Sequence, residues 1–149
     1  MSYKSSEGST YASKDLSGNP LFGAVGSIDT TFFGVAPTVT EGQVLVYNKV
    51  LPKGTWMYTV SAVPFVSAPN ELTGARLDVG TGYGITNVFI STSGFKDNTT
   101  TSRQVLTSGA YYSDGVTALQ AVLTCTTSAG TWSVTYPQDD SQMVVTKVA

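Results

Sequence analysis

The side chains that could do chemistry in this chain are ten carboxylates and one thiol, because histidine is absent. Histidine is the commonest general base, the usual partner of a nucleophilic serine or cysteine, and the commonest zinc ligand. The enzymatic arrangement that remains open is a glycosidase pair of carboxylates, which must lie roughly 5 to 10 Å apart. We expect no enzymatic activity, no catalytic residues and no cofactor.

The carboxylates show no metal-binding or catalytic spacing. Four fall in predicted turns, where aspartate bonds to nearby backbone groups: Asp97, Asp114, Asp139 and Asp140. The pair Asp139-Asp140 lacks the alternating acidic spacing of a calcium loop, so a solvated loop is preferred and no metal is predicted. Asp78 interrupts a predicted strand, and Arg76, two residues away, should share its face. A surface ion pair is favoured there over a contact between subunits.

Two other features invite a chemical interpretation that their context does not favour. Gly80-Thr81-Gly82-Tyr83-Gly84 has the composition of a phosphate-binding loop, but Ile85 to Ile90 after it has the pattern of a strand, not a helix. We therefore predict a hairpin connection. Cys125 lies in an alternating run and is predicted to be a small buried apolar side chain.

Charge and composition exclude several classes of partner. The net charge is −2 and the eight Lys and Arg residues are scattered without a basic stripe, so nucleic-acid binding is not expected. Charged residues make up 12% of the chain, against about 25% in average globular proteins. Residues Met1 to Leu16 lack the pattern of a signal peptide, and no apolar run approaches the ~20 residues of a membrane helix. We expect synthesis in a cytoplasm and no membrane partner.

Strand-like runs of alternating residues, separated by turn signals, cover the chain from Thr40 onward. Eight runs are predicted as strands: 42–51, 55–66, 72–79, 85–92, 103–112, 116–126, 131–136 and 141–148. This spacing predicts an all-β protein built as an antiparallel β-sandwich or barrel. Trp56 and Trp132 are expected to pack inside it.

Residues 1–40 differ from the rest, because glycines interrupt their apolar residues. Two interpretations stay open. In the first, residues 1–40 are an extended attachment arm and residues 41–149 form the sandwich; the contacts of the arm would be Leu21, Phe22, Ile28, Phe32 and Phe33. In the second, the segment is a first strand plus irregular coil of the same sandwich.

Aromatic residues are abundant, with eight tyrosines. Tyr and Trp favour protein interfaces and sugar-binding surfaces. Tyr111 and Tyr112 are adjacent in a predicted strand, so at least one should leave the core. The predicted subunit interface consists of Tyr58, Tyr111, Tyr112, Met143 and Val145.

The later strands resemble those of a known class. The run 54–60, Gly-Thr-Trp-Met-Tyr-Thr-Val, resembles the Gly-x-Tyr-x-(Phe/Val) strand of the tumour necrosis factor and C1q class. Residues 130–134 and 141–148 resemble the last two strands of that class. The resemblance implies a compact jelly roll, trimers, and a final strand near the threefold axis.

The Thr-, Ser- and Gly-rich composition and the apolar N-terminal segment resemble bacteriophage capsid decoration (cement) and head-fibre proteins. This resemblance implies a trimeric virion protein on the capsid surface that binds the major capsid protein or another virion protein. The alternative is a receptor- or carbohydrate-binding module of a phage fibre or adhesin. Its loops 80–84, 93–101 and 137–140 would then hold a glycan.

Overall fold

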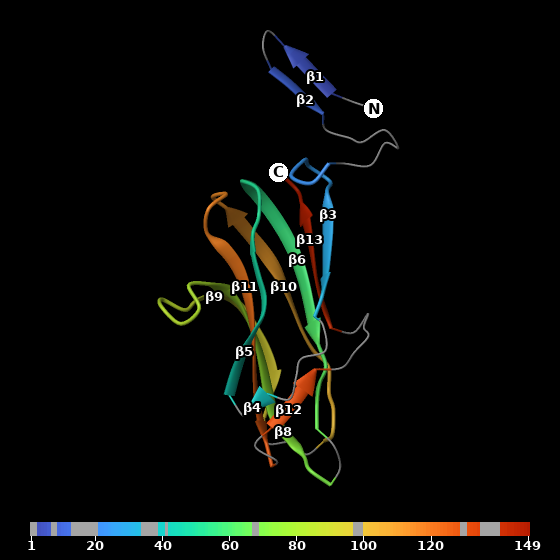
Figure 1. The fold of residues 1–149 in the computed structure, drawn as a ribbon, viewed down its shortest axis with the longest axis vertical. Helices are drawn as coiled ribbons and strands as arrows, with labels where there is room; N and C mark the ends of the chain where they lie inside the picture. Colours follow the sequence, from blue (N-terminus) through green and yellow to red (C-terminus); the bar gives the residue numbers. More distant parts are fainter. Residues whose placement is uncertain are drawn as a thin grey trace.

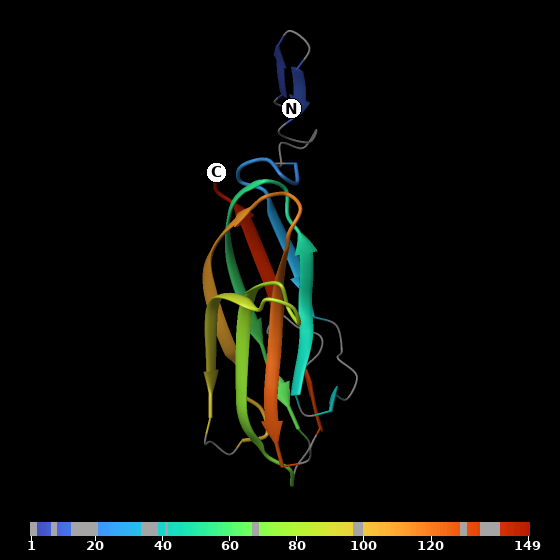
Figure 2. The ribbon, with the colours of Figure 1, turned by 90° about the vertical axis from the view of Figure 1, so that its left-hand side faces the viewer.

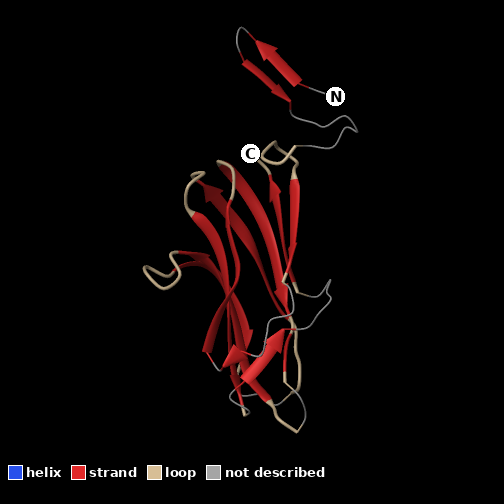
Figure 3. Cartoon of the chain, viewed as in Figure 1, coloured by secondary structure: helices blue, strands red, loops and turns tan. Residues whose placement is uncertain are grey.

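A computed structural model describes residues 3–6, 9–12, 21–33, 39–40, 42–66, 69–96, 100–128, 131–134 and 141–149. Side chains are described in these ranges except at residues 3–12, 39, 40, 42 and 131–134. Every regular element in this part of the chain is a strand (Figure 3), which confirms the all-β prediction. Accordingly, no helix among the described residues has the length and hydrophobicity of a membrane span.

The strands are β1 (Tyr3–Ser6), β2 (Ser9–Ala12), β3 (Ile28–Phe32), β4 (Val39–Thr40), β5 (Gly42–Val50), β6 (Gly54–Ala62), β7 (Pro64–Phe65), β8 (Leu72–Thr81), β9 (Val88–Phe95), β10 (Val105–Ser113), β11 (Ala118–Thr127), β12 (Thr131–Val134) and β13 (Gln142–Lys147). From β5 onward, each of the eight predicted runs coincides with a strand.

Eight strands form two four-stranded antiparallel sheets that face each other (Figure 1). Sheet I has the order β10-β6-β13-β3, and sheet II has the order β5-β11-β8-β9. Among the described strands of sheets I and II, the β8–β9 hairpin alone joins consecutive neighbours in the same sheet, and the other connections cross between the two sheets. This strand order is that of a jelly roll, and it confirms the predicted antiparallel sandwich.

The core lies between the two sheets and follows the predicted alternation of residues. Its fully buried large side chains include Trp56, Val60, Met143 and Val145 from sheet I, and Leu77, Val79, Leu119 and Leu123 from sheet II. Trp56 is in the core as predicted, whereas the side chain of Trp132 lies outside those described. Cys125 is buried, and burial raises the pKa of its thiol to about 12, which confirms its role as a small apolar side chain.

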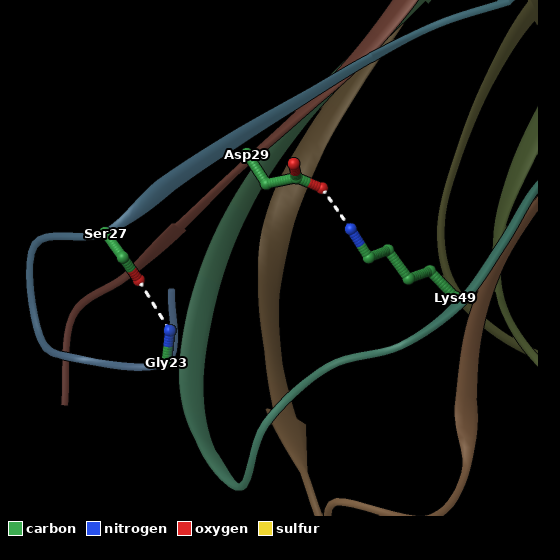
Figure 4. A network of polar contacts seen from close by, with 4 residues as sticks. All are labelled: Gly23, Ser27, Asp29 and Lys49. Atoms are coloured by element: carbon green, nitrogen blue, oxygen red, sulfur yellow. Dashed lines mark hydrogen bonds and ion pairs between the residues drawn. The ribbon is translucent and has the colours of Figure 1, made fainter. Parts of the chain in front are cut away.

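Strand β3 belongs to the sandwich, although it lies before residue 40, where the boundary between an arm and the sandwich was predicted. It pairs with β13 as the edge strand of sheet I, and Phe33 directly after it is buried in the core. Asp29 on β3 also accepts a hydrogen bond from Lys49 on β5, with 2.6 Å between Nζ and Oδ2, so this pair links the edges of the two sheets (Figure 4). Residues 28–33 therefore belong to the sandwich and not to a separate arm.

The predicted hairpin connection between β8 and β9 is present. Between β8 and β9, the N–H groups of Ile85, Thr86 and Asn87 all donate to the carbonyl of Gly82, each at 2.9 Å. Gly82 has a φ of 70°, a conformation that favours glycine. Because residues 85–87 complete this turn, β9 begins at Val88 and not at Ile85 as predicted. The connection is a hairpin, as expected from its glycines.

Candidate functional site

The acidic and thiol side chains of the described residues do not gather into a cluster. Within the described ranges, no three His, Cys, Asp or Glu side chains lie together in a way that could hold a metal ion. The carboxylate of Asp114 accepts hydrogen bonds from the N–H groups of Thr117 and Val116 in its own turn. These hydrogen bonds lower the pKa of Asp114. Asp139-Asp140, with the rest of the 137–140 loop, lies outside the described residues.

Four of the five residues predicted for a subunit interface are in the core instead: Tyr58, Tyr111, Met143 and Val145. They lie on the inner faces of β6, β10 and β13, so that prediction is wrong for these four. The hydroxyl of Tyr58 crosses above Gly109 and makes a 2.6 Å hydrogen bond with Ser91 of sheet II. Burial raises the pKa of this tyrosine. Tyr112, the fifth residue, is exposed on the outer face of sheet I.

The outer face of sheet I carries no charged side chain among its described residues. Strand register places Ile28, Thr146, Met57 and Ala110 in one row across the four strands, and Thr30, Val144, Thr59 and Ser108 in the next. We call this surface the uncharged face; its members are Ile28, Thr30, Phe32, Thr55, Met57, Thr59, Ser61, Leu106, Ser108, Ala110, Tyr112, Gln142, Val144 and Thr146.

Five members of the uncharged face are large apolar or aromatic side chains exposed to solvent: Ile28, Phe32, Met57, Leu106 and Tyr112. Two of its strands, β3 and β10, are sheet edges. Solvated edge strands usually carry charges that prevent pairing with other chains, but β10 has no charged residue and Asp29 of β3 is paired with Lys49. The outer face of sheet II differs, because it carries Arg76 and Asp78. An uncharged surface with several exposed apolar side chains is typical of a region that another protein covers.

Residues 21–27 form a loop that covers one end of the sandwich. The Phe22 ring lies against Trp56, with 5.6 Å between the ring centroids, and Lys49 Nζ lies 4.7 Å from the centroid of the Phe22 ring. Lys147 donates to the carbonyl of Gly23 at 2.7 Å. The N–H of Gly23 donates to Ser27 at 3.2 Å, as Figure 4 shows. This loop is thus attached to the sandwich.

The five residues expected to make contacts as an arm therefore have different locations. Leu21, Phe22, Ile28 and Phe32 are exposed, and Ile28 and Phe32 belong to the uncharged face. Phe33 is buried in the core, so the expected contact of this residue with a capsid is wrong.

Replacing Phe22 by alanine is expected to lower the free energy of unfolding by about 1 kcal/mol, because the ring contact with Trp56 is lost. Urea denaturation followed by circular dichroism would measure it. Ile85→Ala is the matched control, since Ile85 is 88% exposed and its removal should change stability little. Equal stabilities of the Phe22→Ala protein and the wild type would contradict the attachment of this loop.

A second apolar surface lies at the β8–β9 connection, which projects from sheet II (Figure 1). Ile85, Val88, Phe89 and Ile90 are all exposed there. Hydrogen bonds hold the loop, since the N–H of Gly84 donates to Asn87 Oδ1 and the N–H of Tyr83 donates to Gln120 Oε1, both at 2.9 Å. We call these residues, 83–90, the apolar loop. The glycan-binding loop predicted at 80–84 overlaps it, and residues 97–99 of the loop at 93–101 are not among those described.

Fold and surface together define an eight-stranded jelly roll with one uncharged sheet face. No protein-family model matches the chain, and no curated protein is similar to it in sequence. Among solved structures, Eiger TNF from S. frugiperda is similar over 80% of this chain and 94% of that one, at 12% identity and a TM-score of 0.45. A structure of the infectious bursal disease virus Gx strain is similar over 94% of this chain, at 13% identity and a TM-score of 0.48. This chain spans 35% of that viral chain.

Proposed function

We propose that this chain is a non-enzymatic virion structural protein, a capsid decoration (cement) protein that assembles with copies of itself as a trimer. The observation that carries the proposal is the uncharged face of sheet I. The low charge content and hydroxyl-rich composition of the chain support the same function.

Self-association is favoured because the uncharged face can be covered without removing ions from water. Desolvation of a charged side chain costs several kcal/mol, whereas the face consists of apolar side chains, hydroxyls and one amide. Depletion of charge is also what distinguishes the centre of protein interfaces from other surfaces.

A closed ring of copies fits the presence of two different uncharged surfaces on one chain. The uncharged face belongs to sheet I, and the apolar loop projects from sheet II. When a surface of one copy binds a different surface of the next, the contact repeats around a ring and can close as a trimer. Attachment to a capsid would then use Leu21 and Phe22, which are exposed outside the uncharged face, and three weak contacts per trimer would add through multivalency.

Light scattering on the full chain tests the assembly. We expect a solution mass three times the 15.6 kDa of one chain. A monomer at concentrations of tens of micromolar would contradict the trimer. For the virion assignment, we expect the chain in gradient-purified virus particles by peptide mass spectrometry, and its absence from them would contradict that part.

The second candidate is a carbohydrate-binding module of a fibre or adhesin. It is favoured by a groove on the outer face of sheet II that is lined by two cations and several hydroxyls and lies on the opposite side of the sandwich from the uncharged face. A protein that binds sugar yet remains monomeric would support this candidate over a decoration protein.

A further inference from the structure

A groove of about 570 Å³ lies on the outer face of sheet II, over β8, β9 and β11. Figure 2 shows this sheet face on, with β9, β8, β11 and β5 side by side. Gly74 and Gly94 line the groove and contribute no side chains to its floor. A Cβ atom at Gly94 would lie 2.2 Å from the carbonyl oxygen of Ala75, so the close approach of β8 and β9 requires glycine there.

Cations gather at this groove although the chain as a whole is acidic. Arg76 and Lys96 line the groove. Two of the eight cations of a chain with net charge −2 therefore line one groove. Their positions are far apart in sequence, and only the pairing of β8 with β9 brings Arg76 and Lys96 together.

A buried carboxylate fixes the position of Arg76. The side chain of Asp78 is only 2% exposed, and it accepts hydrogen bonds from Arg76 Nε at 2.8 Å and from Thr92 Oγ1. Arginine has five N–H donors, and this contact uses the one on Nε. The Arg76 side chain remains 54% exposed, so the donors at the end of its guanidinium can reach a ligand in the groove. A fixed guanidinium loses less entropy when it binds a carboxylate or sulfate.

Hydroxyl groups supply the remaining polar lining. Thr92, Ser93, Thr124 and Thr126 all contribute to the groove. Thr124 stands opposite Arg76 in the β11–β8 register. Its Oγ1 is buried and has no hydrogen-bond partner among the described residues, so the accessible hydroxyls of the groove come from its other threonine and serine residues.

We propose that this groove binds an acidic saccharide. Its carboxylate or sulfate would pair with the guanidinium of Arg76 and the ammonium of Lys96, and its hydroxyls would bond to the threonine hydroxyls. A volume of about 570 Å³ is within the range of small-molecule sites and exceeds the need of a bare anion. The proposal is independent of the trimer, because the groove and the uncharged face lie on opposite sheets.

Titration of the full chain with 3′-sialyllactose, followed by two-dimensional NMR, tests the proposal. We expect chemical-shift changes at Arg76, Lys96 and Thr124, a Kd of roughly 1 mM, and weaker binding at high salt. Neutral lactose should bind at least roughly tenfold more weakly, since it lacks the anionic group. A sulfated disaccharide serves as the second anionic probe, and either acid binding at these residues would support the proposal.

Variants separate the groove from a general charge effect. Lys96→Gln should weaken binding roughly tenfold, whereas Lys53→Gln removes the same charge from an exposed turn away from the groove and should leave binding unchanged. Arg76→Lys keeps a cation beside the buried Asp78, so the fold should survive, but it loses the planar donor set and should also weaken binding.

Three results would overturn the proposal. The first is equal binding of lactose and sialyllactose. The second is equal effects of the Lys96→Gln and Lys53→Gln changes. The third is binding of acetate, sulfate or an acidic peptide at these residues as tightly as both acidic sugars, which would identify a general anion or protein site instead.

Discussion

A lysine in place of Met57 should convert the proposed trimer into folded monomers. Met57 is in the middle of the uncharged face, 53% exposed, and its row neighbours Thr146 and Ala110 carry no charge that could pair with an ammonium group. An unpaired charge buried in an interface costs about 3–5 kcal/mol, and each 1.4 kcal/mol weakens binding tenfold. We expect association to weaken more than about a hundredfold, measured by sedimentation or light scattering over a concentration series.

The matched control for this experiment is Val50→Lys. Val50 is 46% exposed, like Met57 it is apolar, and it lies at the end of β5 in sheet II. Both variants should retain the circular dichroism of the wild type, because neither side chain is in the core. If the Val50→Lys protein dissociates and the Met57→Lys protein remains a trimer, the interface lies on sheet II, and its assignment to sheet I is wrong.

Alternation along the strands allowed most of the fold to be predicted, but not which face of each strand points inward. Trp56 and Tyr58 are two residues apart in β6 and so share a face. Once Trp56 is assigned to the core, Tyr58 must be there too. Tyr58 was nevertheless predicted to be an interface residue, because its hydroxyl is polar. The structure resolves this through Ser91, whose hydroxyl lies across the core within hydrogen-bond distance of Tyr58.

Strand β3 was harder to predict because its neighbour is remote in sequence. The run Ile28–Phe32 is short and follows glycines, and it is stabilised by pairing with β13, more than a hundred residues later. Local pattern carries no information on such a partner. The uncharged face and the groove have the same origin, since each consists of positions on several strands that only the sheet order makes adjacent.

Alanine in place of Trp56 is expected to give the largest loss of stability in the chain, about 3–5 kcal/mol. The indole is fully buried, its N–H donates to the carbonyl of Pro52 at 2.8 Å, and Phe22 covers it. Domains of this kind have about 5–15 kcal/mol of stability in total, so the variant is at or near the limit of folding. Urea denaturation should be measured at one fixed protein concentration, because assembly adds to apparent stability.

Two further variants locate the cause of that loss. Trp56→Phe keeps much of the ring volume but leaves the Pro52 carbonyl without its indole donor, and should cost about 1–2 kcal/mol. Met57→Ala, one residue along β6, should change the stability of the monomer little, because its side chain points out of the sandwich. A shift of β6 by one residue would exchange the inner and outer faces. In that case Met57→Ala would destabilise the protein more than Trp56→Ala, and both the core and the uncharged face would be assigned to the wrong side chains.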